Sequence, residues 1–208
     1  MKTNLIIGGI GGQGVVTCGT LISKAAIHSG INVIMSEIHG LAQRGGSVSV
    51  EVRMGEVHGP IIPIGKGDLL IGLEYMEGIR NLCRLREGAT AILSPEKMTP
   101  VSLSMNRKEY PDFEEMLSKE AKKLMIYEIN APRLAIETGD RRTSNSVLLG
   151  FVSALKILPL TNADFFDAIS STFPEKVIST NLKAFELGSK VVARAKLREY
   201  KQEIIELG

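Results

Sequence analysis

A short apolar strand that runs directly into a cluster of glycines is the feature that most restricts the fold of this sequence. After the apolar residues 5–7, Gly9, Gly11 and Gly14 form the pattern G-x-G-x-x-G. Such glycines permit a tight turn, close approach of a phosphate to the backbone, and close packing of helix on strand. The helix predicted over residues 12–29 would direct its free N–H groups and positive dipole end at that anion. The turn therefore predicts a nucleotide-like anion as ligand, while a turn that only packs is the alternative.

Alternating strand and helix patterns in the first two thirds of the chain predict an α/β fold. We expect it to be Rossmann-like, with a mostly parallel sheet covered by helices. Strands are predicted at residues 3–8, 32–37, 47–53, 68–73, 89–93 and 125–129. Helices are predicted at residues 12–29, 75–85 and 112–124. The strict alternation of residues 47–53 indicates a half-exposed strand, for which residues 57–64 are the expected partner.

The strand pattern disappears after about residue 131, and three or four helices are expected from there on. The last is long, with Leu182, Phe185, Val192 and Ala195 on one face. We expect a single domain over residues 1–208, with an α/β core over about 1–130. The helical extension over about 131–208 would pack on that core or on a partner.

Composition excludes several functional classes. The formal charge is +2, which is too small for a nucleic-acid surface. The only cysteines, Cys18 and Cys83, are too far apart in the sequence for clustered metal ligands, so we expect no metal site and two buried thiols. No stretch approaches the roughly 20 apolar residues of a membrane span, and no leader peptide is recognisable, so we expect a cytoplasmic protein.

A second polar loop is predicted beside the glycine turn. Glu37 stands at the end of the second predicted strand, near the position where a Rossmann-type acidic residue receives a ribose hydroxyl. Arg44 can donate two N–H groups to a phosphate or carboxylate, and Gly45 and Gly46 let backbone N–H groups approach the same anion. We therefore predict anion or interface binding here, with a surface ion pair of Arg44 as the alternative.

Candidates for proton transfer are few. His39 could titrate near neutral pH, but the sequence places no nucleophile beside it. Thr143 or Ser144 could cap a helix that begins near residue 140. Asn145 in that region is predicted to reach a ligand or another subunit, and a simple capping role is equally compatible with the sequence.

Three segments resemble one family. They are G-I-G-G-Q-G at residues 9–14, E-I-H-G-L-A-Q-R-G-G at 37–46 and N-L-K-A-F-E-L-G at 181–188. They resemble the small subunits of indolepyruvate ferredoxin oxidoreductases, within the two-oxoacid ferredoxin oxidoreductases, over nearly the whole chain. The broader family shares G-x-G-G-Q-G and R-G-G, whereas H-G-L-A-Q is typical of the indolepyruvate branch.

The resemblance implies an enzyme complex that oxidatively decarboxylates arylpyruvates with coenzyme A, giving an aryl-acetyl-CoA, carbon dioxide and reduced ferredoxin. It places thiamine diphosphate and the iron–sulfur clusters in a large partner subunit, so that this chain alone would bind no cofactor and be inactive. Combined with the residue pattern, it implies that Gly11, Gly12, Gln13, Gly14 and Arg44 help to bind coenzyme A or shape its channel at the subunit interface, and packing against the large subunit is the alternative. A stand-alone NAD(P)-dependent dehydrogenase and a non-catalytic assembly protein are the competing functions.

Overall fold

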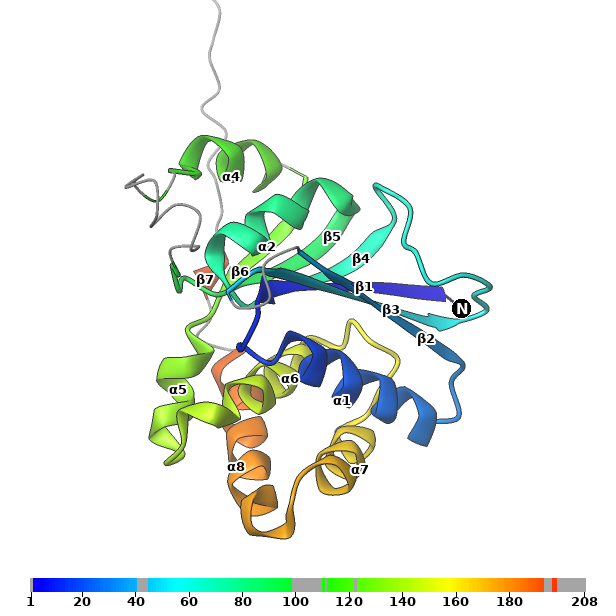
Figure 1. Ribbon diagram of the computed structural model, residues 1–208, viewed down its shortest axis with the longest axis vertical. Helices are drawn as coiled ribbons and strands as arrows, with labels where there is room; N and C mark the ends of the chain where they lie inside the picture. Colours follow the sequence, from blue (N-terminus) through cyan, green and yellow to red (C-terminus); the bar gives the residue numbers. More distant parts are fainter. Residues whose placement is uncertain are drawn as a thin grey trace, which may run out of the picture.

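The computed structural model describes residues 2–40, 45–98, 110, 112–121, 123–192 and 196–197. Its centre is a seven-stranded sheet with the order β2-β3-β1-β4-β5-β6-β7 (Figure 1). The strands are β1 (Lys2–Ile10), β2 (Val33–His39), β3 (Ser47–Gly55), β4 (Gly67–Gly72), β5 (Leu85–Leu93), β6 (Met125–Glu128) and β7 (Lys196–Leu197). The apolar β1 lies in the middle of the sheet, as expected for a strand that is buried on both faces.

Five of the seven strands run in the same direction. Strands β1, β4, β5 and β6 pair in parallel, and β2 joins them because it is antiparallel to β3, which is itself antiparallel to β1. The predicted mostly parallel α/β fold is therefore confirmed. The two-residue β7, which pairs with β6, was not predicted.

Strand β3 was assigned the wrong partner. Residues 57–64 form no strand, and β3 pairs instead with β1 and β2. Its alternation reflects two different layers: Val50 and Val52 face the larger core, while Glu51 and Arg53 face the other side of the sheet, where loop residues 59–62 cover them. Side chains buried on both faces explain why the half-exposed reading was also wrong.

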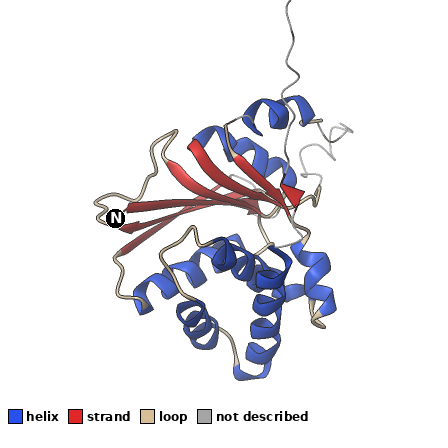
Figure 2. Cartoon of the chain, turned by 180° about the vertical axis from the view of Figure 1, so that it is seen from behind, coloured by secondary structure: helices blue, strands red, loops and turns tan. Residues whose placement is uncertain are grey.

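Helices cover the two faces of the sheet unequally (Figures 1 and 2). The smaller layer holds α2 (Tyr75–Asn81), which continues as a 3₁₀ turn, and α4 (Glu114–Ala121). The larger layer holds α1 (Val15–His28), α5 (Ala131–Glu137), α6 (Ser144–Leu155), α7 (Asn162–Thr172) and α8 (Glu175–Val191). The predicted helices are thus all present, with ends shifted by a few residues. The helical extension packs on the core, because one buried cluster joins β1, β3 and α1 to α6, α7 and α8.

Helices α6 and α8 are in backbone contact. A Cβ atom at Gly188 would lie 2.7 Å from the carbonyl carbon of Val147, and one at Gly150 would lie 2.8 Å from that of Phe185. Near the same crossing, the hydroxyl of Ser146 donates to the side chain of buried Asn181 at 2.7 Å. The N-L-K-A-F-E-L-G segment therefore serves the packing of two helices.

The two cysteines differ in exposure. Cys18 is fully buried in α1, and burial raises its pKa to about 12. Cys83 is exposed on the 3₁₀ turn after α2, so the prediction of two buried thiols was wrong for Cys83. Its segment was read as one continuous helix, whereas the helix ends at Asn81.

Candidate functional site

The glycine turn connects the centre of the sheet to the first turn of α1. Gly14 is the N-cap of α1 and has φ 78° and ψ 30°, a left-handed conformation that favours glycine. Gly12 also has a positive φ, 99°. The N–H of Gly11 donates to the carbonyl oxygen of Gly46 at 2.9 Å, so the predicted second loop does return to the turn. The first-turn N–H groups of α1 have no intrahelical partners and point away from the helix, as an anion site requires.

Gln13 holds this turn in shape. Its Oε1 accepts the N–H of Ile10 at 2.9 Å, and its Nε2 donates to the carbonyl oxygen of Leu73 at 3.2 Å. The same Nε2 lies 3.4 Å from the sulfur of Met98. Gln13 therefore links the turn to the end of β4, a role that needs glutamine in place of a shorter residue. Its direct contact with a ligand stays a prediction.

Glu37 and His39 lie on the edge strand β2, with side chains on the same face. Oε2 of Glu37 lies 3.0 Å from Nε2 of His39, and both side chains are partly exposed. In the sheet register Glu37 is opposite Val50, which is opposite Ile7. Strand β3 thus separates Glu37 from β1 by two strand spacings, about 10 Å. A Rossmann-type ribose acceptor sits on a strand that pairs directly with β1, so the spacing argument for Glu37 does not transfer to this sheet.

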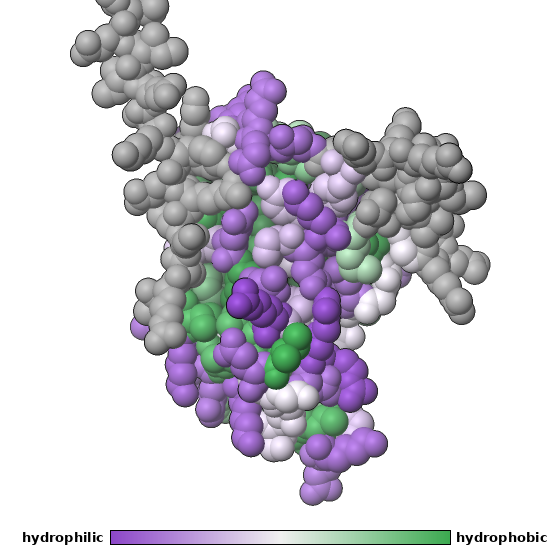
Figure 3. All heavy atoms as spheres, turned by 90° about the vertical axis from the view of Figure 1, so that its left-hand side faces the viewer, coloured by the Kyte–Doolittle hydropathy of each residue, from purple (hydrophilic) through white to green (hydrophobic). Residues whose placement is uncertain are grey.

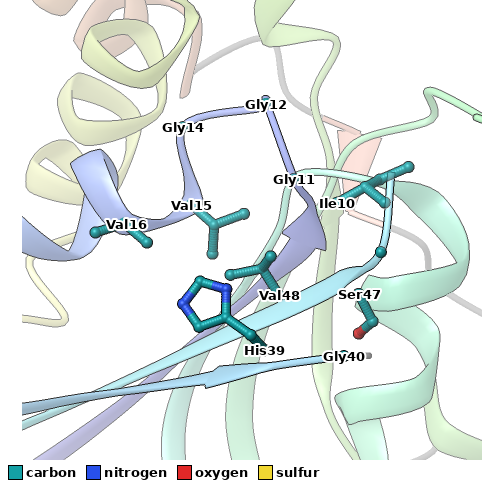
Figure 4. A pocket seen from close by; sticks show the side chains of 11 residues that line it. Ile10, Gly11, Gly12, Gly14, Val15, Val16, His39, Gly40, Ser47 and Val48 are labelled. Atoms are coloured by element: carbon teal, nitrogen blue, oxygen red, sulfur yellow. The ribbon is translucent and has the colours of Figure 1, made fainter. Parts of the chain in front are cut away.

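One cavity lies on the β2 side of the glycine turn. It has a volume of about 570 Å³, and its lining includes Gly11, Gly12, His39, Gly46 and Val48. Figure 4 shows the imidazole of His39 near Val48 and Val15, with the glycine turn running above them. The sequence therefore placed His39 and the glycines of both loops correctly in one region.

A second cavity, of about 560 Å³, lies on the other side of the same turn. Gly12, Gln13 and Gly14 line it together with Ser144 and Asn145 at the start of α6. Nδ2 of Asn145 donates to the carbonyl oxygen of Gly14 at 2.9 Å, across 131 positions of the sequence. Asn145 thus lies at the glycine turn. It does not cap α6, because Thr143 occupies the N-cap position.

Charged side chains surround this second cavity. Arg141 pairs with Glu96 at 2.5 Å, and Arg142 pairs with Asp140 at 2.7 Å. Hydrogen bonds from Arg142 lower the pKa of Asp140. Figure 3 faces this end of the molecule and shows a mostly hydrophilic surface interrupted by hydrophobic patches. Arg141, Arg142 and Glu96 were not predicted as site residues, because only the fold brings them beside the glycine turn.

The remaining predicted residues belong to the second loop. Gly45 has a positive φ of 65°, and Gly46 accepts the hydrogen bond from Gly11. Arg44 lies outside the described residues, so its role stays a prediction.

Within the described ranges, no group of three or more histidine, cysteine, aspartate or glutamate side chains is arranged to hold a metal ion. Among the same residues, no helix is long and apolar enough to cross a membrane.

The mostly parallel sheet, the glycine turn with its glutamine and the two adjoining cavities define an α/β protein with a candidate ligand site at the start of α1. The chain belongs to the pyruvate ferredoxin/flavodoxin oxidoreductase family, which it matches over residues 4–191. The resemblance found in the three sequence segments is therefore confirmed.

Curated relatives that are at least 35% identical to the chain are indolepyruvate oxidoreductase subunits. The chain is 39% identical over 189 residues to the indolepyruvate oxidoreductase subunit IorB of Methanothermobacter thermautotrophicus, covering 90% of this chain and 96% of the relative. It is 36% identical over 190 residues to the IorB subunit of Thermococcus kodakarensis, covering 90% and 94%. Identity falls to 24% over 195 residues for the 2-oxoglutarate synthase subunit KorC of Methanothermobacter marburgensis, covering 92% and 97%.

Solved structures share the fold. The gamma subunit of a keto/oxoacid ferredoxin oxidoreductase from Geobacter sulfurreducens has a TM-score of 0.68 at 22% identity, covering 92% of this chain and 99% of that one. The 2-oxoglutarate:ferredoxin oxidoreductase from Magnetococcus marinus has a TM-score of 0.71 at 19% identity. In that comparison 95% of this chain matches only 32% of the other, so the same fold also occurs as part of a longer chain.

Proposed function

We propose that this chain is the small subunit of an indolepyruvate-type ferredoxin oxidoreductase. The complex would convert an arylpyruvate and coenzyme A to an aryl-acetyl-CoA and carbon dioxide, with electrons passing to ferredoxin. The observation that carries this proposal is the 39% identity to an IorB subunit over almost the full length of both chains, against 24% for a 2-oxoglutarate synthase subunit.

The cofactors of this reaction are assigned to a large partner subunit. Thiamine diphosphate supplies the decarboxylation chemistry and iron–sulfur clusters carry the electrons. Residues of this chain do not fit a cluster: Cys18 belongs to the larger core and Cys83 to the exposed turn on the other side of the sheet. An isolated subunit would therefore be inactive.

The contribution proposed for this chain is to bind coenzyme A at the subunit interface. The left-handed Gly14 and the first turn of α1 offer backbone N–H groups to a phosphate, and Gln13 fixes the turn before the ligand arrives. Arg44 would add a charged donor from the second loop. The coenzyme A and succinyl-CoA bound in the Magnetococcus marinus enzyme support this ligand class.

Co-expression with the large subunit tests the function. Purified complex should reduce ferredoxin only when both coenzyme A and indolepyruvate or phenylpyruvate are present. Pyruvate and 2-oxoglutarate should be poor substrates. Native tagged chain that co-purifies with no thiamine diphosphate and iron–sulfur partner would contradict the assignment and favour an assembly role.

Calorimetric titration of coenzyme A into the complex tests the ligand. Arg44→Ala should weaken binding about tenfold or more, since hydrogen bonds to a charged group contribute about 1.5–3 kcal/mol. Arg133→Ala is a matched control, because Arg133 is an exposed arginine of α5 that lines neither cavity. Equal affinity of the Arg44→Ala complex and the unaltered complex would exclude the proposed role of Arg44.

The stand-alone dehydrogenase is not supported. G-x-G-x-x-G and Glu37 together permit a dinucleotide fold, but the antiparallel β3 separates the strand of Glu37 from β1. Titration of NAD and NADP into the same preparations provides the corresponding check.

A further inference from the structure

Two helices begin at the second cavity. Gly12, Gly14 and Thr17 line it from the start of α1, and Ser144 and Asn145 line it from the start of α6. Helix N-termini carry partial positive charge and free N–H groups. The 14-residue α1 therefore favours an anion in this space, whereas α6 continues the 3₁₀ turn Arg141–Thr143, and the N–H of Ser144 already donates to the carbonyl oxygen of Arg141.

Asn145 contributes an acceptor that requires a hydrogen-bond donor, which an anion does not provide. Its residue is 8% exposed, and its Oδ1 is buried with no hydrogen-bond partner among the described residues. Nδ2 donates to the carbonyl oxygen of Gly14, so the amide cannot be flipped: a flip would place Oδ1 against that carbonyl oxygen, and both atoms are acceptors. A buried acceptor without a donor costs about 1–3 kcal/mol. A ligand that brings an N–H group would remove that cost.

The first cavity lacks this combination. Glycines, Ser47 and four aliphatic residues line it, and its titratable side chain, His39, is already paired with Glu37. The second cavity has the unpaired acceptor of Asn145 beside the start of α1, and the arginines in its lining, Arg141 and Arg142, are paired with Glu96 and Asp140.

We propose that the second cavity, and not the first, holds a phosphate group together with a neighbouring N–H donor of the same ligand, and that Asn145 is the residue that selects the donor. This inference rests on the proposed function, in which coenzyme A is the phosphate-bearing ligand. Coenzyme A carries such a pair both in its adenine nucleotide and in its phosphopantetheine arm, and free ADP carries the first. Asn145 is a specificity-determining residue in this arrangement, and the start of α1 provides the partial positive charge.

A matched pair of cavity-filling variants tests the location in the assembled complex. Ser144→Phe places a ring in the second cavity, and Val16→Phe places one in the first. Ser144→Phe should weaken coenzyme A binding at least tenfold in calorimetric titration, and Val16→Phe should leave it within twofold. The reverse pattern would place the ligand in the first cavity and overturn the inference while leaving the proposed function intact.

Asn145→Leu tests the donor recognition. Coenzyme A should bind about tenfold more weakly, as expected for one lost hydrogen bond. The melting temperature should stay close to that of the unaltered chain, because loss of the Asn145–Gly14 bond is offset by removal of the unpaired acceptor. A lower melting temperature with unchanged affinity would show a purely structural role and overturn the inference.

Competition by ADP and by 4′-phosphopantetheine identifies which end of coenzyme A enters. Whichever fragment competes in the unaltered complex should lose its effect in Asn145→Leu. Competition that is equally strong in both complexes would contradict the role of Asn145. A complex that binds no coenzyme A at all, and turns over no oxoacid, would instead remove the proposed function.

Discussion

Replacing Gly188 by alanine should force α6 and α8 apart, because the added methyl group has no space between the two backbones. A Cβ atom there would overlap the carbonyl oxygen of Val147 and lie 2.7 Å from its carbonyl carbon, whereas ordinary contacts begin at 3.4 Å. The obstacle is backbone within a helix, so no side-chain rotation relieves it. The helices must separate, by about 1 Å, and the packed side chains on both then lose contact.

The expected loss can be estimated from the side chains at the crossing. Phe185 and Val147 are at most 1% exposed, and full burial of such a side chain contributes about 1.5–3 kcal/mol. A gap of about 1 Å forfeits up to about half of their dispersion energy, and overpacked cores typically lose about 1–3 kcal/mol. Alanine regains up to about 1 kcal/mol of helix propensity. We expect a net loss of about 1–2 kcal/mol, which lowers the melting temperature of a chain of this length by about 2–8 °C.

Calorimetry or circular dichroism on purified protein measures this change. Gly150→Ala should behave similarly, because its Cβ would meet the backbone of Phe185. The double variant should lose less than the sum of the two, since one separation of the helices accommodates both methyl groups. Gly59→Ala is the control, because nothing lies within 4 Å of its added Cβ. A Gly188→Ala protein as stable as the Gly59→Ala control would refute the backbone contact.

Three further predictions concern single sites. Lys156 ends α6 with φ 54° and ψ 32°, so Lys156→Gly should raise the free energy of unfolding by about 0.5–1 kcal/mol in urea titrations, and a decrease would contradict the left-handed cap. Alkylation of native protein at pH 8 should modify the exposed Cys83 and spare Cys18, because burial raises the pKa of Cys18 and keeps its thiol protonated. Mass spectrometry measures the labelling, and equal labelling of the two cysteines would contradict the burial of Cys18 in α1. Hydrogen bonds from Arg142 lower the pKa of Asp140, so the Asp140 carboxylate stays charged when the pH falls through the ordinary pKa of an aspartate and is neutralised only at lower pH. In an NMR titration, Arg142→Ala should raise the pKa of Asp140. An unchanged pKa would exclude the Asp140–Arg142 pair in solution.

Local patterns sufficed for much of the fold. The apolar run before the glycines predicted β1, and the run at residues 68–73 predicted β4, because strands buried on both faces need continuous apolar sequence. The turn itself was predictable from its glycines, since few other residues adopt a positive φ without strain. Strand order was not predictable in the same way. The alternation of residues 47–53 indicates a strand but does not identify the neighbouring strands, and in the sheet β3 lies between β1 and β2.

The site shows the same division. Gly11 and His39 line one cavity because Gly11 follows β1 and His39 ends β2, and these two strands end at the same edge of the sheet. Gln13 was chosen for ligand binding, and only the fold showed that both ends of its amide are used to hold the turn. The ribose role suggested for Glu37 failed because sequence spacing counts residues and not intervening strands.

The sequence by itself determined the class of fold, the glycine turn and the family, because these depend on local conformation and on short sequence motifs. The tertiary structure decided which distant groups meet that turn. Asn145 reaches Gly14 across 131 positions, and the backbones of α6 and α8 approach closely where Gly150 meets Phe185 and Gly188 meets Val147. Such contacts depend on how whole helices pack on the sheet, and packing is a property of the assembled core that no single segment encodes.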